Sequence, residues 1–336
     1  MDPVSQGALG AAFAQTNQQK EKLVAAAWIG CAAGMAPDLD VLIQSSTDPL
    51  LFLEFHRHFT HALIFIPVGA AIVAFALYRL VKHRLSPTEA YLAALLGYAT
   101  HGLLDACTTY GTQLLWPFSD ARIAWNNVSV VDPALTIPLL ACVILTARTK
   151  RRAFAVTGIS WVIAYLLLGV YQMERAEAVG AKLAEQRGHT PNRLTTKASF
   201  ANLIVWKSIY EFEGQYYVDG VRVAGSSEHC SGTNIPKLDI TRDLPFLDEN
   251  SQQAEDVERF RWFSDDYLAP WGQHSVTDIR YSLLPHQVDP MWGITLSPSA
   301  SPNDHVEWWS NREARAAALD QFQALLMGEG CTPIGL

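Results

Sequence analysis

Apolar and polar positions divide the chain into two unlike halves. In the first half, long apolar runs alternate with short polar breaks. The runs cover residues 7–15, 23–36, 62–81, 89–106, 134–147 and 153–171. The run at 62–81 contains only one charged residue, Arg79, and is about 20 residues long, as a helix that crosses a bilayer needs to be. We therefore predict a multi-span helical membrane domain over residues 1–175.

The first two runs leave two arrangements open. Residues 23–36 are shorter than the roughly 20 residues that span a bilayer. They form either a short spanning helix or one arm of a re-entrant hairpin with residues 7–15. Pro37 ends the second run, because the residue before a proline is disfavoured in the α conformation. The sequence from Ser86 to Glu89 is a typical helix start, and Asp132 is a typical N-cap for the helix at 134–147.

The second half of the chain, residues 185–336, predicts a small α+β domain outside the membrane. Strands are expected where β-branched and aromatic residues alternate with polar ones between glycine turns. These segments are 203–212, 216–223, 276–284 and 292–296, and helices are expected at 254–263 and 305–326. The whole chain is therefore predicted to be mainly α, with this α+β domain following the membrane domain.

Basic residues predict the orientation of the helices. They cluster at three turns, around Lys20 and Lys22, around Lys82 and Arg84, and from Arg148 to Arg152. Cytoplasmic loops carry an excess of such residues, so all three turns are placed in the cytoplasm. The C-terminal domain then lies outside it, in the periplasm of a bacterial inner membrane. There, Cys230 and Cys331 form either a disulfide or two unpaired buried thiols, and sequence does not decide between them.

Charge narrows the range of partners. The net charge of −8 comes mostly from the second half, so no basic surface is offered to phosphates and nucleic acid is excluded as a partner. Membrane lipids and a small or lipid-like substrate remain as expected partners.

Two polar islands interrupt the apolar sequence and carry the candidate chemistry. The first comprises residues 37–40 and 56–61, and the second comprises residues 101–105. Ionisable residues beside membrane helices are costly and indicate a functional site. The six candidate metal ligands are Asp38, Asp40, His56, His61, His101 and Asp105. His101 and Asp105 are four residues apart on one helix and share a face. The mixed nitrogen and oxygen donors favour zinc, with manganese and iron as alternatives.

Each of these residues also has a simpler explanation. Asp38 and Asp40 are common types in turns and caps. His101 and Asp105 alone would often be a hydrogen-bonded pair, and His56 and His61, five apart, do not share a helical face. The predicted topology nevertheless places all six candidates at one membrane surface, which favours a metal centre over several separate coincidences.

Two arginines are candidates for catalysis. Arg57 and Arg122 could bind an anionic group in bidentate fashion and steady the negative charge that develops during hydrolysis. The alternative for both is contact with lipid headgroups.

The polar islands also carry a family resemblance. Residues 2–7, 37–40, 56–61, 101–105 and 110–119 resemble, in order and spacing, the YdjM-like family of bacterial inner-membrane, metal-dependent hydrolases. The resemblance covers about residues 1–175 and implies a helical metal cradle distantly related to that of zinc-dependent phospholipase C. It does not define the substrate. Two positions depart from the family pattern: His58 stands where glycine is usual, and Gln6 stands where some members have histidine.

Three functions are compared on this basis. The first is a membrane-bound hydrolase that acts on a phosphoester or ester at the outer face of the membrane, where a bound divalent ion would activate water. The second is a non-catalytic membrane protein with a structural metal site and a partner-binding outer domain. The third is a transporter, which the small number of spans and the clustering of polar residues at one face argue against.

Overall fold

The computed structural model describes residues 1–311 and 315–335 and contains two compact units. The first unit comprises residues 1–43, 55–171 and 200–202. The second comprises residues 44–54, 172–199 and the described residues from 203 onward. The segment 44–54 therefore belongs to the second unit, although the chain on both sides of it belongs to the first.

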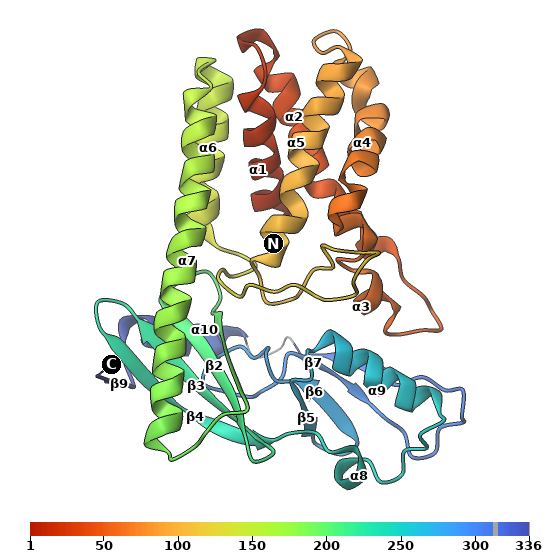
Figure 1. The fold of residues 1–336 in the computed structure, drawn as a ribbon, viewed down its shortest axis with the longest axis vertical. Coiled ribbons are helices and arrows are strands. Elements are labelled where there is room, and N and C mark those ends of the chain that lie inside the picture. Colours follow the sequence, from red (N-terminus) through yellow and green to blue (C-terminus); the bar gives the residue numbers. More distant parts are fainter. Residues whose placement is uncertain (312–314, 336) are drawn as a thin grey trace. The chain divides into compact units, whose positions relative to one another are not determined.

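The first unit is helical (Figure 1), as the apolar runs predict. Its helices are α1 (Pro3–Thr16), α2 (Leu23–Met35), α4 (Ile66–Val81), α5 (Pro87–Ala106), α6 (Pro133–Thr149) and the first part of α7 (Ala153–Gln186). Short 3₁₀ turns connect them, η1 (Lys20–Lys22), η2 (Ala36–Leu42), η3 (Phe59–His61) and η4 (Leu63–Phe65). Helix α7 ends at Gln186 rather than at 171, because strong helix formers such as Ala and Glu continue beyond its apolar part.

The expected helix starts are confirmed by their hydrogen bonds. Ser86 accepts from the Glu89 backbone N–H, and the Glu89 carboxylate accepts from the Ser86 backbone N–H, which together form a capping box. One carboxylate oxygen of Asp132 accepts from the Ala134 N–H and caps α6.

Among the described residues, three helical stretches are long and apolar enough to cross a membrane by length and composition. They are Lys20–Leu42, Leu63–Val81 and Ala153–Gln186, and α6 is a shorter apolar helix. Large apolar side chains on these helices, such as Phe75, Leu80 and Leu167, are exposed. Such exposure is expected of a surface that faces lipid.

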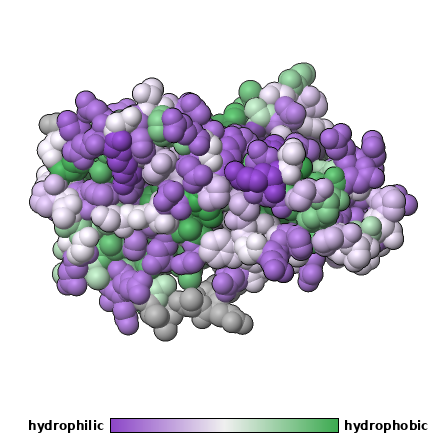
Figure 2. All heavy atoms as spheres, turned by 90° about the horizontal axis from the view of Figure 1, so that it is seen from below, coloured by the Kyte–Doolittle hydropathy of each residue, from purple (hydrophilic) through white to green (hydrophobic). Residues whose placement is uncertain are grey.

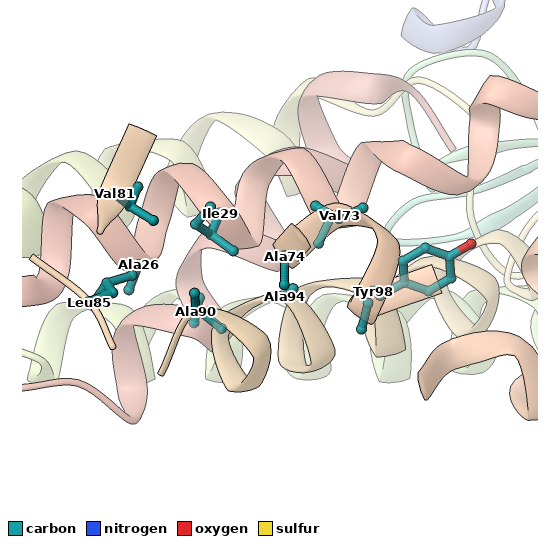
Figure 3. Packing of buried hydrophobic residues seen from close by; sticks show 13 residues of the cluster. Ala26, Ile29, Val73, Ala74, Val81, Leu85, Ala90, Ala94 and Tyr98 are labelled. Carbon is teal, nitrogen blue, oxygen red and sulfur yellow. The ribbon is translucent and has the colours of Figure 1, made fainter. Parts of the chain in front are cut away.

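Small residues bring α1, α2 and α5 into close contact. A Cβ on Gly30 would lie 2.4 Å from the Gly10 carbonyl oxygen, and a Cβ on Gly97 would lie 2.4 Å from the Gly30 carbonyl oxygen. Membrane helices commonly use small residues in this way. The neighbouring core is also made of small and medium side chains of α2, α4 and α5 (Figure 3), including Ala26, Ile29, Val73, Ala74, Ala90, Ala94 and Tyr98.

The second unit contains two antiparallel sheets. The first has the order β1-β2-β3-β4-β9 and the second the order β5-β6-β7-β8. The strands are β1 (Arg193–Ala198), β2 (Val205–Phe212), β3 (Gln215–Val223), β4 (Ser227–Pro236), β5 (Leu268–Trp271), β6 (Ser275–Asp278), β7 (Trp292–Thr295), β8 (Glu307–Ser310) and β9 (Cys331–Pro333). The helices are α3 (Leu51–Phe55), of which Phe55 belongs to the first unit, α8 (Ile240–Asp243), α9 (Gln252–Phe263) and α10 (Arg315–Met327). The face seen in Figure 2 is mostly hydrophilic, as expected of a surface in contact with water.

Two predicted elements of this unit are corrected. The strand expected at 276–284 ends at Asp278. The helix expected at 305–326 is wrong at its start, since Glu307–Ser310 is strand β8, paired with β7, and the described part of helix α10 covers Arg315–Met327. Two tryptophans in this short segment favour a strand. Residues 312–314 lie outside the described part of the chain.

Cys230 and Cys331 form a disulfide that joins β4 to β9. Cys31, Cys107 and Cys142 are free thiols. Of the two arrangements that the sequence left open, the structure therefore has the bonded one.

Candidate metal centre

The first polar island is formed where α2 gives way to a 3₁₀ turn. Pro37 follows the last residues of α2, and η2 then carries Asp38 and Asp40. The packing of α5 against α2 brings the second island to the same place. Gly97 packs on Gly30, and one turn further along both helices the His101 ring meets the Gly34 carbonyl oxygen at 2.6 Å.

Four of the predicted ligands surround one point. Nε2 of His61 and Nε2 of His101 are 2.9 Å apart. An Asp38 carboxylate oxygen lies 3.6 Å from the first nitrogen and 3.4 Å from the second. An Asp105 carboxylate oxygen lies 3.2 Å and 3.5 Å from the same two nitrogens. One ligand atom from each of the four residues therefore lies within 4.8 Å of the other three.

Hydrogen bonds fix the direction of both imidazole rings. Only an N–H can donate to the Gly34 carbonyl, so Nδ1 of His101 carries the proton and its Nε2 presents a lone pair. Nδ1 of His61 lies 3.2 Å from an Asp40 carboxylate oxygen, which leaves Nε2 of His61 free to face the cluster. Partners of this kind orient histidine ligands in known metal sites.

Asp40 and His56 form a second group with Asp38. One Asp40 oxygen lies 2.8 Å from Nδ1 of His56. The other accepts from the Arg57 backbone N–H at 2.9 Å and from the Thr60 hydroxyl at 3.1 Å, and it faces His61. Both oxygens of Asp40 are thus engaged in holding other groups. In this arrangement Asp40 orients His61 and His56, and Asp38 is common to both groups.

Arg57 is buried behind Asp105. Its Nε lies 3.1 Å from an Asp105 carboxylate oxygen, and Nη1 donates to the Asp105 carbonyl and to the Thr108 hydroxyl. The backbone of Arg57 has a φ of +66°, which residues other than glycine rarely adopt. This conformation directs the Arg57 N–H at Asp40. The structure thus places Arg57 as a support of Asp105.

Arg122 is not brought into the cluster. Its Nη2 donates to the carbonyl oxygens of Tyr110 and Gly111, and its guanidinium lies 5.3 Å from the centre of the Tyr110 ring. It holds the loop between α5 and α6. His58 is likewise outside the cluster and lies 5.3 Å from the ring of Trp116.

The ligands of the centre differ in exposure. The side chains of His61, His101 and Asp105 are 0% exposed, whereas that of Asp38 is 23% exposed. His56, in the same group as Asp38, is also partly exposed. Within the described part of the chain, Asp38 and His56 therefore form the accessible side of the centre.

Negative charge dominates around His61. Burial alone would lower the pKa of its imidazole, but its hydrogen bonds to Asp105, Asp38 and Asp40 raise the pKa to about 10. The N-terminal amine of Met1 forms an ion pair with Asp105 on the other side. An environment that favours positive charge this strongly also favours a bound cation.

Gln6 is a part of the site that the sequence did not reveal as such. Its side-chain amide donates to an Asp105 carboxylate oxygen at 2.9 Å and to the His101 carbonyl oxygen. At position 6 this chain therefore has a residue that orients a candidate ligand. The Gly34 carbonyl and Thr108 were also missed, because neither residue type marks a metal site in a sequence.

The residues present fit a divalent ion. Two imidazole nitrogens face each other at 2.9 Å, an arrangement that requires a cation or a proton between them. One buried oxygen of Asp105 has no well-aligned hydrogen bond among the described residues. The two imidazole nitrogens of His61 and His101 and the carboxylate oxygens of Asp38 and Asp105 are donor types that zinc binds.

Fold and site together define a class, namely a multi-span helical membrane protein with a candidate metal centre at one end of its helices. The YdjM inner membrane protein family matches residues 1–176, which are more than half of the chain. The chain belongs to this family, and an inner-membrane location follows from that membership and from the apolar helices.

Two curated relatives share part of the sequence. An uncharacterized protein, YfhP of Bacillus subtilis, is 27% identical over 144 residues, which are 43% of this chain and 42% of that protein. The inner membrane protein YbcI of Escherichia coli is 32% identical over 111 residues, which are 32% of this chain and 63% of that protein. The chain thus spans less than two thirds of the length of either relative. No solved structure matches it.

Proposed function

We propose that this protein is a membrane-bound, metal-dependent hydrolase that acts on a phosphoester or ester at the outer face of the inner membrane. The observation that carries the proposal is the four-residue cluster, in which Asp38 is accessible while His61, His101 and Asp105 are buried. A catalytic zinc site keeps a coordination position for water, and the accessible side at Asp38 is where water could reach an ion held by the three buried residues.

The residues have separate roles in this proposal. Asp38, His61, His101 and Asp105 hold the ion, while Asp40, Gln6 and Arg57 keep His61 and Asp105 in place. A divalent ion bound there would polarise a phosphoryl or carbonyl oxygen and lower the pKa of water. Hydrolysis forms a bond from the water oxygen to phosphorus or carbonyl carbon and breaks the bond to the alcohol, which takes up a proton. His56, partly exposed beside Asp38, lies where it can exchange that proton with solvent.

The proposed activity is tested with purified protein that carries its metal. We expect one or two divalent ions per chain and metal-dependent hydrolysis of at least one substrate in a panel of phosphodiesters, phosphomonoesters and carboxylic esters. Chelation should abolish hydrolysis, and zinc should restore it. Stoichiometric metal without hydrolysis of any substrate would favour the second function, a structural metal site in a partner-binding membrane protein.

The outer location of the site is a separate part of the proposal. It is supported by the basic turns and by the Cys230–Cys331 disulfide, since disulfides persist in oxidising compartments. We expect a C-terminal alkaline phosphatase fusion, active only in the periplasm, to be active, and a C-terminal green fluorescent protein fusion to be dark. The opposite pair of results would place the second unit in the cytoplasm and overturn this orientation.

A further inference from the structure

A groove lined almost entirely by apolar atoms runs along α1, α2 and α6. Its volume is about 520 Å³. Small residues such as Gly7 and Ala8 are buried and form its floor, while Trp28, Met35 and Ile144 are exposed and form its rims. None of the candidate metal ligands lines it.

The dimensions of the groove limit what can occupy it. Between Val24 and Met35 it follows α2 for about 16 Å at 1.5 Å per residue, which is about half of the roughly 30 Å hydrocarbon core of a bilayer. The groove thus has about the length of one leaflet. Its exposed rims are apolar and α2 lies within a candidate membrane span, so lipid surrounds the groove and an acyl chain is the occupant that the bilayer supplies there.

One end of the groove lies at the end of the helices that carries the metal centre. Met35 lines the groove and lies three residues before Asp38. Pro3 also lines the groove, and Gln6 on the same helix donates to Asp105. An amphiphile with its chain in the groove would therefore have its polar end near Asp38, the accessible side of the centre.

We propose that the groove binds one acyl chain of a lipid whose headgroup is the part that the metal centre hydrolyses. The substrate class is then an ester or phosphoester amphiphile rather than a water-soluble ester. The role of the headgroup rests on the proposed hydrolase function, whereas binding of the chain does not.

The binding step is tested with the full chain in lipid nanodiscs. The probe is phosphatidic acid with a photoreactive diazirine in one acyl chain, and the crosslinked peptides are identified by mass spectrometry. We expect crosslinks concentrated on α1, α2 and α6. Ala27→Phe and Ala147→Phe fill the groove from two different helices, so each should reduce these crosslinks several-fold, because the added ring occupies the space that the chain would fill.

Ala76→Phe is the matched control. Ala76 is exposed on α4, within another candidate span, and does not line the groove. The crosslinks should be unchanged in this variant. Equal labelling of all lipid-facing helices, or no effect of either filling variant in protein that remains monodisperse, would overturn the inference.

Activity assays separate this inference from the proposed function. We expect Ala27→Phe to lower the ratio of long-chain to two-carbon ester hydrolysis several-fold, because only the long chain needs the groove, and Ala76→Phe to leave the ratio unchanged. If wild-type protein crosslinks in the groove but hydrolyses no substrate, the hydrolase proposal fails and chain binding stands. If metal-dependent hydrolysis is present but neither crosslinking nor the ratio depends on Ala27, the groove inference fails alone.

Discussion

Alanine at His101 should weaken the binding of a divalent ion by at least about 100-fold, because it removes a ligand rather than a supporting partner. The His101 ring is fully buried, its Nδ1 is held by the Gly34 carbonyl, and its Nε2 faces His61, Asp38 and Asp105. The methyl group of alanine offers the ion no lone pair in place of that nitrogen. The measurement is metal content after dialysis, followed by a competition titration with a zinc-binding dye.

The aspartates should fall into a graded series. Asp38→Asn should cause a loss comparable to that in His101→Ala, since Asp38 belongs to both groups of ligands. Asp40→Asn should weaken binding less, by about 10- to 100-fold, as expected for a residue that orients a histidine ligand. If Asp40→Asn strips the metal completely and Asp38→Asn does not, then Asp40 is a ligand and the assignment of the two residues is reversed.

Asp132→Asn is the matched control. Asp132 is a fully buried carboxylate of the same unit, but it caps α6 and accepts from the Tyr165 hydroxyl at 2.8 Å. Asparagine caps helices nearly as well, so we expect a loss of stability of about 1 kcal/mol and unchanged metal content. Loss of metal in this variant would show that general destabilisation of the membrane unit is enough to empty the centre.

The sequence predicted the helices of the first unit because the bilayer imposes a length and a composition on them. The runs at 23–36, 62–81 and 153–171 correspond to candidate membrane spans of the described chain, whereas α5 is not among these spans and α6 is shorter. It also predicted which residues would cluster. His101 and Asp105 share a helical face by spacing alone, and Asp38 could be placed at a helix end by Pro37. The convergence of His61 on them depends on the irregular chain from residue 43 to residue 62, for which no periodic pattern exists.

Role is harder to predict than position. Asp40 and Asp38 are the same residue type two positions apart, yet one has both oxygens engaged by His56, Thr60 and the Arg57 backbone, and the other is partly open. From charge alone, Arg57 and Arg122 are both expected to bind an anionic group. The structure separates them, because hydrogen bonds to Asp105 in one case and to loop carbonyls in the other are tertiary contacts that spacing does not encode.

Arg259 lies far from the metal centre in sequence. Its guanidinium holds segment 44–54 on α9 of the second unit. Nε donates to Glu54 at 2.5 Å, and the two terminal nitrogens donate to the two carboxylate oxygens of Asp48 at 3.1 Å and 2.8 Å. It also pairs with the buried Asp256 at 2.8 Å. Leu50 and Leu53 of the same segment are buried.

Segment 44–54 lies between the two parts of the first polar island. It begins a few residues after Asp40 and ends immediately before Phe55 and His56. The chain thus leaves the first unit after Asp40 and returns to it just before His56. An anchor at 44–54 consequently limits how far Asp40 and His56 can move.

Arg259→Met should lower the free energy of unfolding of the second unit by about 2 kcal/mol. Breaking a fully buried pair costs about 3–5 kcal/mol, and partial exposure of Asp48 and Glu54 reduces that figure. We also expect the affinity for a divalent ion to fall several-fold, although Arg259 is not a ligand. Arg259→Lys should recover little, since an ammonium cannot reproduce the bidentate contact with Asp48.

Arg261→Met provides the comparison on the same helix. Arg261 pairs with Glu258 and Asp266 and with no residue of segment 44–54. It should lower stability modestly and leave metal affinity unchanged, as measured by denaturant unfolding and dye competition on the same preparations. If Arg259→Met lowers stability but leaves metal affinity at the wild-type value, the ligands are positioned by the membrane helices alone, and the excursion of the chain into the second unit has no influence on the centre.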